Sequence, residues 1–551
     1  MNWAPCGGRR LLVPLLAASL LASGASAQSK DENFLASLAE LPTASYVDKE
    51  AIAERLMASG HPNARAVLTA LLEDRLYLRT QDQRIFIIKS ADAVERLELI
   101  DPVSLNDAGS GAPDAFERVG TNNRLRRALR IAVSRFALAS PDPSVRHTAV
   151  NEMLRSLDEA TVDLLRARIT VETDAAVRYD IETGLALVAL DGGDREARLT
   201  AIRSLAGRLR PEVRNRLAAM IEPSSDGTFT EPDAAVRNAA ADAVRSIDSS
   251  RSLYSGIETL FFGLSLGSVL VLVATGLAIT FGVMGVINMA HGEFMMLGAY
   301  TTYVVQSVMP SAIGASILVS IPAAFIVAGL AGVLLERTII RFLYGRPLET
   351  LLATFGVSLV LQQFVRSIFS ANNRAVSTPP WLSGTLQINE ALALTYNRLY
   401  IVLFTLIVFA ILLIVLKRTR LGLDIRAVSQ NRGMAKAMGI PTEWVDAMTF
   451  GLGSGIAGVA GVALSQLTNV GPNLGQSYII DSFMVVVFGG VGNLWGTMIG
   501  GMSLGIVNKL LEPYAGAVLG KIFVLIAVVL FIQRRPRGLF PQTGRAAESA
   551  S

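Results

Sequence analysis

Long apolar stretches dominate the second half of the chain and constrain its fold more than any other feature. From residue 257 to residue 532 the sequence consists mainly of Leu, Val, Ile, Ala, Gly and Phe, and charged residues are confined to short segments. An apolar stretch of about 20 residues can cross a bilayer as a helix. We therefore predict a polytopic helical membrane domain of about eight or nine spans, at 257–287, 294–309, 313–335, 351–369, 399–416, 444–467, 483–492, 495–511 and 516–532.

Residues 1–27 predict a secretory signal peptide. Arg9 and Arg10 precede an apolar run at 11–21, and small residues then end at Ala27 in an A-x-A pattern. This order of charged, apolar and small residues is typical of a signal that is cleaved after export. Cys6, the only cysteine in the sequence, lies before the expected cleavage point, so we expect no disulfide in the mature chain.

Residues 28–250 are rich in charge and predict an exported domain of repeated helices. Asp142, Asp174 and Asp233 each open a D-x-x-V-R motif, and apolar residues follow three or four positions apart. The aspartate is expected to cap a helix whose apolar stripe packs on its neighbour. Such units resemble HEAT-type repeats, so the predicted fold class of the whole chain is all-α. A platform for a partner protein and a structural spacer remain equal alternatives for this domain.

Basic loops predict the orientation of the membrane domain. Lys and Arg gather in three connections, at 337–346, 417–436 and 534–537, whereas the connections at 370–398 and 468–482 hold only Arg374 and Arg398. Positively charged loops face the cytoplasm. We therefore expect an exported amino-terminal domain and a cytoplasmic carboxyl terminus, which the signal peptide predicts independently.

A few polar side chains interrupt the apolar spans and predict a path for a solute. Buried polar groups without partners are costly inside a membrane, so they mark functional candidates. Uncharged donors and acceptors suit a small polar or zwitterionic solute better than an ion. The alternative for the first three residues is structural, because they could cap a break between helices. The candidates are Asn288, His291, Glu293, Ser358, Gln362, Gln466 and Asn493.

The sequence favours neither an enzyme nor a protein that binds nucleotides or nucleic acids. No nucleophile–base set is evident, and the isolated His61 and His147 lack metal-ligand spacing, so we expect no catalytic residue and no metal site. Residues 453–458 satisfy G-x-G-x-x-G but lie inside an apolar stretch, which predicts close helix packing instead. The net charge of +4 is small for 551 residues and does not indicate nucleic acid as a partner.

A basic island at 417–441 combines positive charges with small residues. It carries Lys417, Arg418, Arg420, Arg426, Arg432 and Lys436, together with Ala427, Gly433, Ala435, Ala437 and Gly439. A solvated loop that only sets topology needs the charges but not the small residues. A short helix pressed against another protein uses both, so the island predicts a docking segment, with a topological anchor as the alternative.

Three stretches carry a resemblance to a known family, INMAHGEFMMLGAY (287–300), LGLDIRAVSQNRGMAKAMGI (421–440) and VFGGVGNLWGTMIGGMSLG (487–505). They closely resemble permease subunits of the branched-chain amino acid type of ABC importer, and the similar region covers about 257–540. The resemblance implies a multi-pass permease of the inner membrane. It also implies four kinds of partner: the lipid bilayer, a homologous second permease subunit, two cytoplasmic ATPase subunits and a periplasmic solute-binding protein. ATP would be used by those partners, and this chain is expected to hold no cofactor.

The resemblance also implies a solute and a coupling surface. The exported extension resembles the long form of permease found in urea importers of this family, so urea is the expected solute and branched-chain amino acids are the runner-up. A passive channel for urea or an amide and a membrane receptor are rivals of other classes. The island would insert into a groove of the ATPase, and its coupling residues would be Arg426, Ala427, Arg432, Met434, Ala435, Met438 and Gly439.

Overall fold

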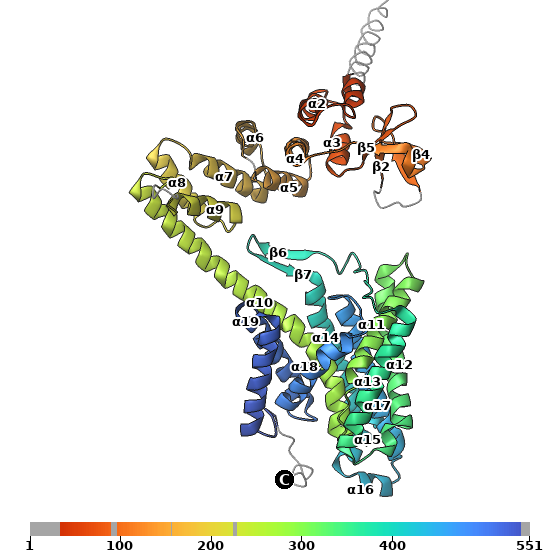
Figure 1. Cartoon of the computed structure of the whole chain (residues 1–551). Coiled ribbons are helices and arrows are strands. Elements are labelled where there is room, and N and C mark those ends of the chain that lie inside the picture. The colour runs from red at the N-terminus through yellow and green to blue at the C-terminus, as the bar shows by residue number, and fades with distance from the viewer. Residues whose placement is uncertain (1–32, 90–95, 156, 224–228, 541–551) are drawn as a thin grey trace, which may run out of the picture. The chain divides into compact units, whose positions relative to one another are not determined.

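The computed structural model describes residues 33–89, 96–155, 157–223 and 229–540, so the expected signal peptide at 1–27 lies outside the described residues. The chain divides into two compact units, the first ending at Asp248 and the second beginning at Ser249 (Figure 1). Helix α10 (Ala234–Met284) contributes its start to the first unit and its remainder to the second.

The first unit begins with a mixed layer of helices and strands. It contains a five-stranded antiparallel sheet with the strand order β4-β3-β2-β1-β5. Along the chain the strands follow α2 (Tyr46–Ala58) and α3 (Ala64–Leu72) and precede α4 (Asn123–Leu138). Leu76 pairs with Ile87 in the centre of the sheet, and β2 is buried along its whole length. The strands are β1 (Leu76–Arg79), β2 (Ile85–Ile88), β3 (Leu97–Ile100), β4 (Asp107–Gly111) and β5 (Phe116–Arg118), with a short 3₁₀ turn at Pro113–Ala115.

The sheet corrects the predicted all-α fold class. Its strands have three to five residues, too few for a period of two to stand out from the surrounding sequence. The β-branched and aromatic residues of β2, Ile85 to Ile88, favour a strand, because such side chains pack well on a pleated surface.

The rest of the first unit is helical, and its caps confirm the prediction made from the D-x-x-V-R motifs. Asp142 and Asp174 accept backbone N–H groups at the starts of α5 and α7, and Asp233 accepts the N–H of Ala235 at the start of α10. The likeness to HEAT-type repeats stays a prediction. The helices are α5 (Pro143–Met153), α6 (Glu159–Ile169), α7 (Ala175–Ala189), α8 (Arg195–Leu205) and α9 (Pro211–Ile221).

A buried carboxylate, Glu172, joins three of these segments. Arg146 donates two hydrogen bonds to it, with Nε–Oε2 at 2.9 Å and Nη2–Oε1 at 2.7 Å, and Arg168 donates to Oε2 at 2.9 Å. The backbone N–H of Asp174 donates to Oε1 at 3.0 Å. The Arg146 hydrogen bonds are the main reason that the pKa of Glu172 falls from 4.5 to about 2, and the backbone N–H and Arg168 lower it further.

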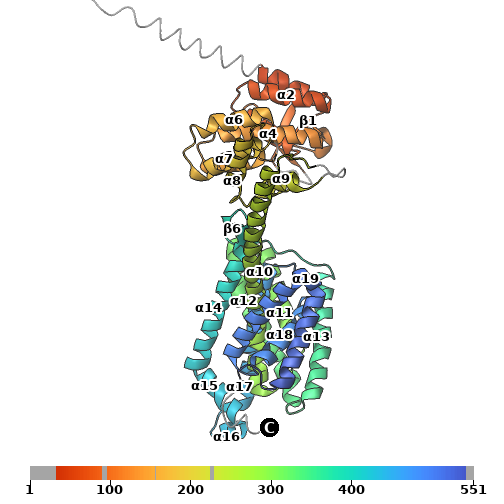
Figure 2. The same ribbon diagram turned by 90° about the vertical axis from the view of Figure 1, so that its left-hand side faces the viewer.

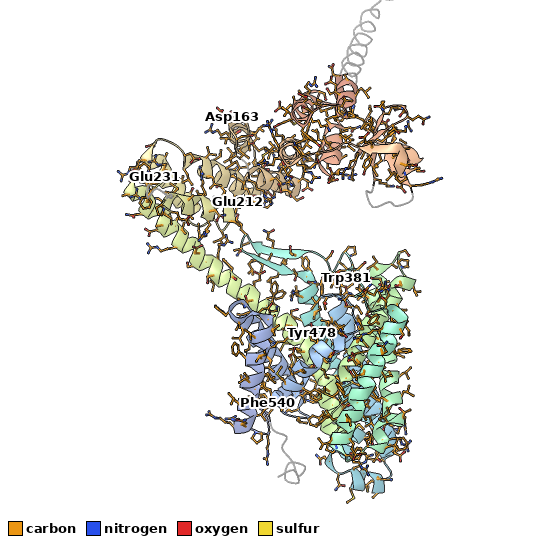
Figure 3. The ribbon with its side chains drawn as sticks, in the orientation of Figure 1. Asp163, Glu212, Glu231, Trp381, Tyr478 and Phe540 are labelled. Carbon is orange, nitrogen blue, oxygen red and sulfur yellow. The ribbon has the colours of Figure 1, made fainter. Side chains whose placement is uncertain are left out.

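Acid is expected to loosen α5–α7 through this carboxylate. A lowered pKa means that Glu172 stabilises the folded state above pH 4.5, and that this stability is lost as the pH falls toward 2. Glu172→Gln should therefore weaken hydrogen-exchange protection of α5 and α7 strongly at pH 6, whereas variant and wild type should converge near pH 2. Asp163→Asn is the control, because Asp163 is exposed and pairs only loosely with Arg166 (Figure 3). Equal protection of Glu172→Gln and wild type at pH 6 would contradict the expectation.

The second unit is a bundle of apolar helices. Figures 1 and 2 place α15 and α16 at one end of the bundle and the β6–β7 hairpin at the opposite end. The elements after α10 are α11 (His291–Val308), α12 (Ile313–Thr338), a 3₁₀ turn (Ile340–Phe342), α13 (Pro347–Phe369), β6 (Thr385–Asn389), β7 (Leu392–Thr395), α14 (Tyr396–Arg418), α15 (Arg420–Gln430), α16 (Arg432–Ala437), α17 (Thr442–Ser465), α18 (Leu474–Gly489) and α19 (Leu494–Arg534).

Among the described residues, six helices are long and apolar enough to cross a membrane, namely α10, α12 with its 3₁₀ extension, α13, α14, α17 and α19. The expected number of about eight or nine spans was higher because α11 and the short apolar α18 were included and because α19 was treated as two spans. Gly516 interrupts α19 with non-helical backbone at φ 76° and ψ 163°, and it is the first residue of the second stretch that was predicted there, 516–532.

Small residues let the central helices approach closely. Helix α17 is buried along nearly its whole length and packs against α11 and α12. A Cβ added to Gly298 of α11 would lie 2.0 Å from the carbonyl oxygen of Gly458 in α17. The G-x-G-x-x-G match at 453–458 lies in this same buried helix, so its glycines serve helix contact, as predicted.

Candidate functional site

A break between two helices of the second unit, α10 and α11, begins the candidate site. Helix α10 ends at Met284, Gly285 adopts a left-handed conformation with φ of 64°, and α11 starts at His291. Asn288 is fully buried, and its Oδ1 accepts the backbone N–H of Ala290 at 3.0 Å. The break thus exposes backbone groups to the protein interior, where side chains must satisfy them.

Glu293 lies in the first turn of α11 and gathers two of the other predicted residues. Ser358 Oγ and Gln362 Nε2 of α13 donate hydrogen bonds to Glu293 Oε1 at 2.9 and 2.8 Å. The Glu293 side chain is buried, and its second oxygen, Oε2, has no hydrogen-bond partner among the described residues. A buried carboxylate oxygen without a partner is free to accept an N–H group from a solute.

The partners of Glu293 belong to a polar row that runs along α13. Four polar residues, spaced four positions apart, lie on the buried face of α13. Arg366 extends the row and donates a hydrogen bond to Asn473 Oδ1 at 2.6 Å. The opposite face carries exposed leucines and phenylalanines, so α13 turns its polar side inward, as a helix in lipid must. The row covers about 24 Å at 1.5 Å per residue, which approaches the thickness of the hydrocarbon core. We call this row, Thr350, Thr354, Ser358, Gln362 and Arg366, the polar ladder.

The ladder also contacts the helix break. Thr354 Oγ1 accepts the backbone N–H of Met289 at 3.1 Å. Ser358 and Gln362 were predicted from the sequence as pathway residues, whereas Thr350, Thr354 and Arg366 were not. A spacing of four residues, which places side chains on one helix face, was the signal that could have found them.

The remaining predicted pathway residues have other surroundings. His291 Nε2 lies 3.0 Å from the carbonyl oxygen of Val273, so this ring joins α11 to α10. Asn493 caps α19 by accepting the N–H of Gly496 at 3.1 Å, and it also donates to the carbonyl oxygen of Phe540 at 3.3 Å (Figure 3). Through these contacts His291 and Asn493 hold parts of the fold together.

Gln466 lines a cavity to which Glu293 does not contribute. It lines an apolar hollow of about 210 Å³ together with Trp381 and Tyr400, and its Oε1 atom has no hydrogen-bond partner among the described residues. The structure therefore brings Asn288, Glu293, Ser358 and Gln362 to one region and leaves Gln466 and Asn493 outside it.

The basic island folds into α15 and α16 at one end of the bundle. Met434 and Met438 are 61% and 77% exposed, and Arg426 and Gly439 are also exposed. Gly439 ends α16 in a left-handed conformation with φ of 87°. Apolar side chains that project into solvent from a rigid turn suit contact with another protein.

Other residues of the island face inward. Ala435 is only 5% exposed and packs in a small core with Ile425, Val428 and Val445. Arg432 donates to Asp446 Oδ2 at 2.5 Å and stacks over the Tyr344 ring. Ala427 is half-buried. Within this chain these three residues hold the island against α17, so they support the exposed surface from beneath.

An ion pair between α18 and α19 was not predicted from the sequence. Lys521, in the part of α19 after Gly516, lies 2.8 Å from Asp481 of α18, and Asp481 is buried. Lys521 also approaches the ring of Tyr478 (Figure 3). Among the described residues no group of three or more His, Cys, Asp or Glu side chains could hold a metal ion.

Comparisons with known proteins agree with this membrane architecture. Residues 259–532 match the family described as the permease component of branched-chain amino acid transport systems. The high-affinity branched-chain amino acid transport system permease protein LivH of Salmonella typhimurium is 30% identical over 294 residues, which are 51% of this chain and 94% of that protein. The corresponding protein BraD of Pseudomonas aeruginosa is 30% identical over 304 residues, 52% of this chain and 96% of that protein.

A more distant likeness covers a shorter region. The ribose import permease protein RbsC of Bacillus subtilis is 32% identical over 134 residues, 22% of this chain and 42% of that protein. No solved structure matches the chain. The extent and identity of the first two matches show that the chain belongs to the family of permease components of branched-chain amino acid transport systems.

Proposed function

We propose that this chain is the permease subunit of an ATP-driven importer and that it carries a small polar solute past Glu293 and along the polar ladder. The observation that carries the proposal is the unpartnered Oε2 of Glu293, in the first turn after a helix break, on a carboxylate whose other oxygen accepts from Ser358 and Gln362. Broken helices at membrane depth are typical of transporter binding sites.

Urea is the proposed solute. It offers four N–H donors and one carbonyl acceptor and no charge, which suits a carboxylate oxygen beside hydroxyl and amide groups. The first unit supports urea as well, because it resembles the extension of the long permease form found in urea importers of this family. Branched-chain amino acids are the second candidate, which the names of the relatives favour. Their ammonium group could also bind Glu293, but their aliphatic side chains would need an apolar wall nearby.

Uptake of radiolabelled urea by cells that lack this chain decides between these solutes. Loss of urea uptake, restored by the chain and not inhibited by excess leucine, supports urea. Unchanged urea uptake together with lost leucine uptake would assign branched-chain amino acids. Urea uptake that survives deletion of the partner ATPase would favour a passive channel over an importer.

We propose that the exposed surface of the island couples ATP binding by a partner ATPase to transport. The residues Arg426, Met434, Met438 and Gly439 would contact a cytoplasmic ATPase, while Ala427, Arg432 and Ala435 hold that surface in place. ATP binding would then move the island and bias the permease toward one of its two access states. A second permease subunit, two ATPase subunits and a solute-binding protein complete the proposed assembly.

The proposed location is the inner membrane, with the first unit on the periplasmic side. The basic loops of the sequence support this orientation. The island and the β6–β7 hairpin lie at opposite ends of the bundle (Figure 1), so they would face opposite compartments. A protease added to intact spheroplasts should therefore cut the hairpin and leave the island intact.

Removing the unpartnered oxygen of Glu293 is expected to slow uptake. In Glu293→Gln the amide oxygen can still accept from Ser358 and Gln362, so the fold is kept, but the unpartnered Oε2 acceptor is replaced by an NH₂ group that can only donate. Loss of one hydrogen bond to the solute costs about 1 kcal/mol or more, so we expect about tenfold weaker solute affinity, measured as a higher KM for uptake. Glu349→Gln is the control, since Glu349 is exposed and pairs with Arg346. An unchanged KM in Glu293→Gln would contradict the proposed site.

A further inference from the structure

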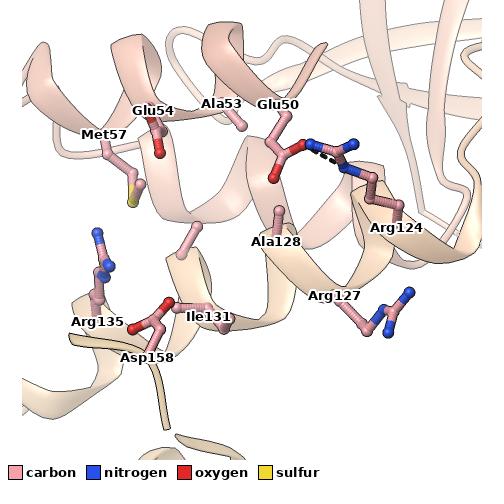
Figure 4. A pocket seen from close by; sticks show the side chains of 11 residues that line it. Glu50, Ala53, Glu54, Met57, Arg124, Arg127, Ala128, Ile131, Arg135 and Asp158 are labelled. Carbon is pink, nitrogen blue, oxygen red and sulfur yellow. Dashed lines mark hydrogen bonds and ion pairs between the residues drawn. The ribbon is translucent and has the colours of Figure 1, made fainter. Parts of the chain in front are cut away.

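The first unit contains a charged pocket that the transport function does not use. It has a volume of about 280 Å³ and lies between α2 and α4, where three arginines and three carboxylates line it (Figure 4). The acidic side chains of α2, Glu50 and Glu54, are four residues apart and share one helix face. Arg124, Arg127 and Arg135 come from α4.

The two walls of the pocket meet at one end and stay apart at the other. At one end Glu50 pairs with Arg124 at 3.1 Å. At the other end lie Arg135 and Asp158 (Figure 4). Arg135 Nε is buried and has no hydrogen-bond partner among the described residues. The structure records no ion pair between Arg135 and Glu54 or Asp158, although all three line the same pocket. Asp158 uses one oxygen to cap α6, accepting the N–H of Thr161 at 2.7 Å.

Small side chains lie between the two walls of the pocket. Ala53 of α2 and Ala128 and Ala132 of α4 line it, and Ala53 and Ala128 lie toward the end where Glu50 pairs with Arg124 (Figure 4). A guanidinium group and carboxylates across an open space attract a molecule that carries both signs of charge, because it can pair with each wall at once. A simple anion would be repelled by Glu54 and Asp158, and a neutral molecule would leave Arg135, Glu54 and Asp158 without ion pairs.

We propose that this pocket binds a zwitterionic α-amino acid. The ligand carboxylate pairs with the Arg135 guanidinium, and the ligand ammonium lies between the carboxylates of Glu54 and Asp158. Met57 and Ile131, which also line the pocket, offer apolar contact to the ligand side chain. The site is separate from Glu293 and the polar ladder, so the proposal does not rest on the identity of the transported solute.

Calorimetric titration of the full chain in lipid nanodiscs tests the proposal. The probes are glycine, L-leucine and L-glutamine, and acetate, methylammonium and urea serve as ligands that carry only part of the recognition chemistry. We expect saturable binding of at least one zwitterion, with an affinity at least tenfold higher than that of acetate or methylammonium. Absence of binding by all three amino acids, or equally tight binding of acetate, would overturn the proposal.

Variants separate this pocket from every other site. Arg135→Gln and Glu54→Gln should each weaken binding at least tenfold, and Ala128→Leu, which fills the floor without changing charge, should do the same. Arg130→Gln is the matched control on α4, because Arg130 is exposed and lies outside the pocket. Glu293→Gln should leave this binding unchanged. Each variant is compared at an unchanged ligand-free melting temperature; binding that persists in Arg135→Gln and Ala128→Leu, or that falls equally in Arg130→Gln, would show that the pocket is not the site.

Discussion

Gly298→Ala is expected to destabilise the membrane bundle by about 1–3 kcal/mol or more, the range of overpacked cores. The added methyl group would lie 2.0 Å from the carbonyl oxygen of Gly458 and 2.6 Å from its Cα. Backbone atoms of a buried helix cannot move aside as a flexible side chain can, so α11 and α17 must separate. The measurement is the melting temperature of the purified chain in detergent, together with the yield of monodisperse protein.

Gly356→Ala is the matched control for Gly298. Gly356 is also a helical glycine in a candidate span, but a Cβ there would meet no atom within 4 Å. Alanine restricts the unfolded backbone more than glycine, so this change should be neutral or stabilising by up to about 1 kcal/mol. The two substitutions are chemically identical and should differ in sign. Equal melting temperatures for both variants would show that the close contact of α11 and α17 does not support the bundle.

The helices of the second unit could be predicted because lipid imposes a simple pattern on them. Long apolar stretches located α12, α13, α14 and α17 well, and a break between helices was one of the two roles considered for Asn288, His291 and Glu293. The D-x-x-V-R aspartates located helix starts for an equally local reason, since a cap needs only the next two or three residues. The five-stranded sheet was missed because its strands pair segments from different parts of residues 76–118, and none of them is long.

The candidate site shows the same division between local and distant information. Glu293, Ser358 and Gln362 were each selected as polar groups in apolar surroundings, but their mutual hydrogen bonds join residues 65 and 69 positions apart. Nothing in one sequence reports such a contact. The direction of a side chain is equally hidden: Ala435 and Met438 share one island, yet the first is buried and the second is 77% exposed.

Ala437→Trp is expected to lower ATP-dependent uptake by at least tenfold. Ala437 ends α16 beside the exposed Met438, and its side chain is exposed. An indole ring there changes the shape of the proposed docking surface without disturbing the core below it. Poor fit at the centre of an interface costs about 2 kcal/mol or more, which corresponds to about a thirtyfold loss of affinity. The measurements are urea uptake and recovery of the ATPase with the tagged permease.

Two further variants, Ala371→Trp and Ala435→Trp, are the controls for Ala437→Trp. Ala371 is an exposed alanine in the loop after α13, outside the island, so tryptophan there should leave uptake and ATPase recovery unchanged. Ala435 is buried against Ile425, Val428 and Val445, so its substitution should lower the melting temperature of the chain, a loss of fold and not of docking alone. If Ala437→Trp retains wild-type uptake while it reaches the membrane in normal amounts, the exposed face of α16 does not transmit the energy of ATP. If Ala371→Trp loses uptake to the same extent, the effect of Ala437→Trp reflects bulk on any exposed loop and gives no support to the island as the coupling surface.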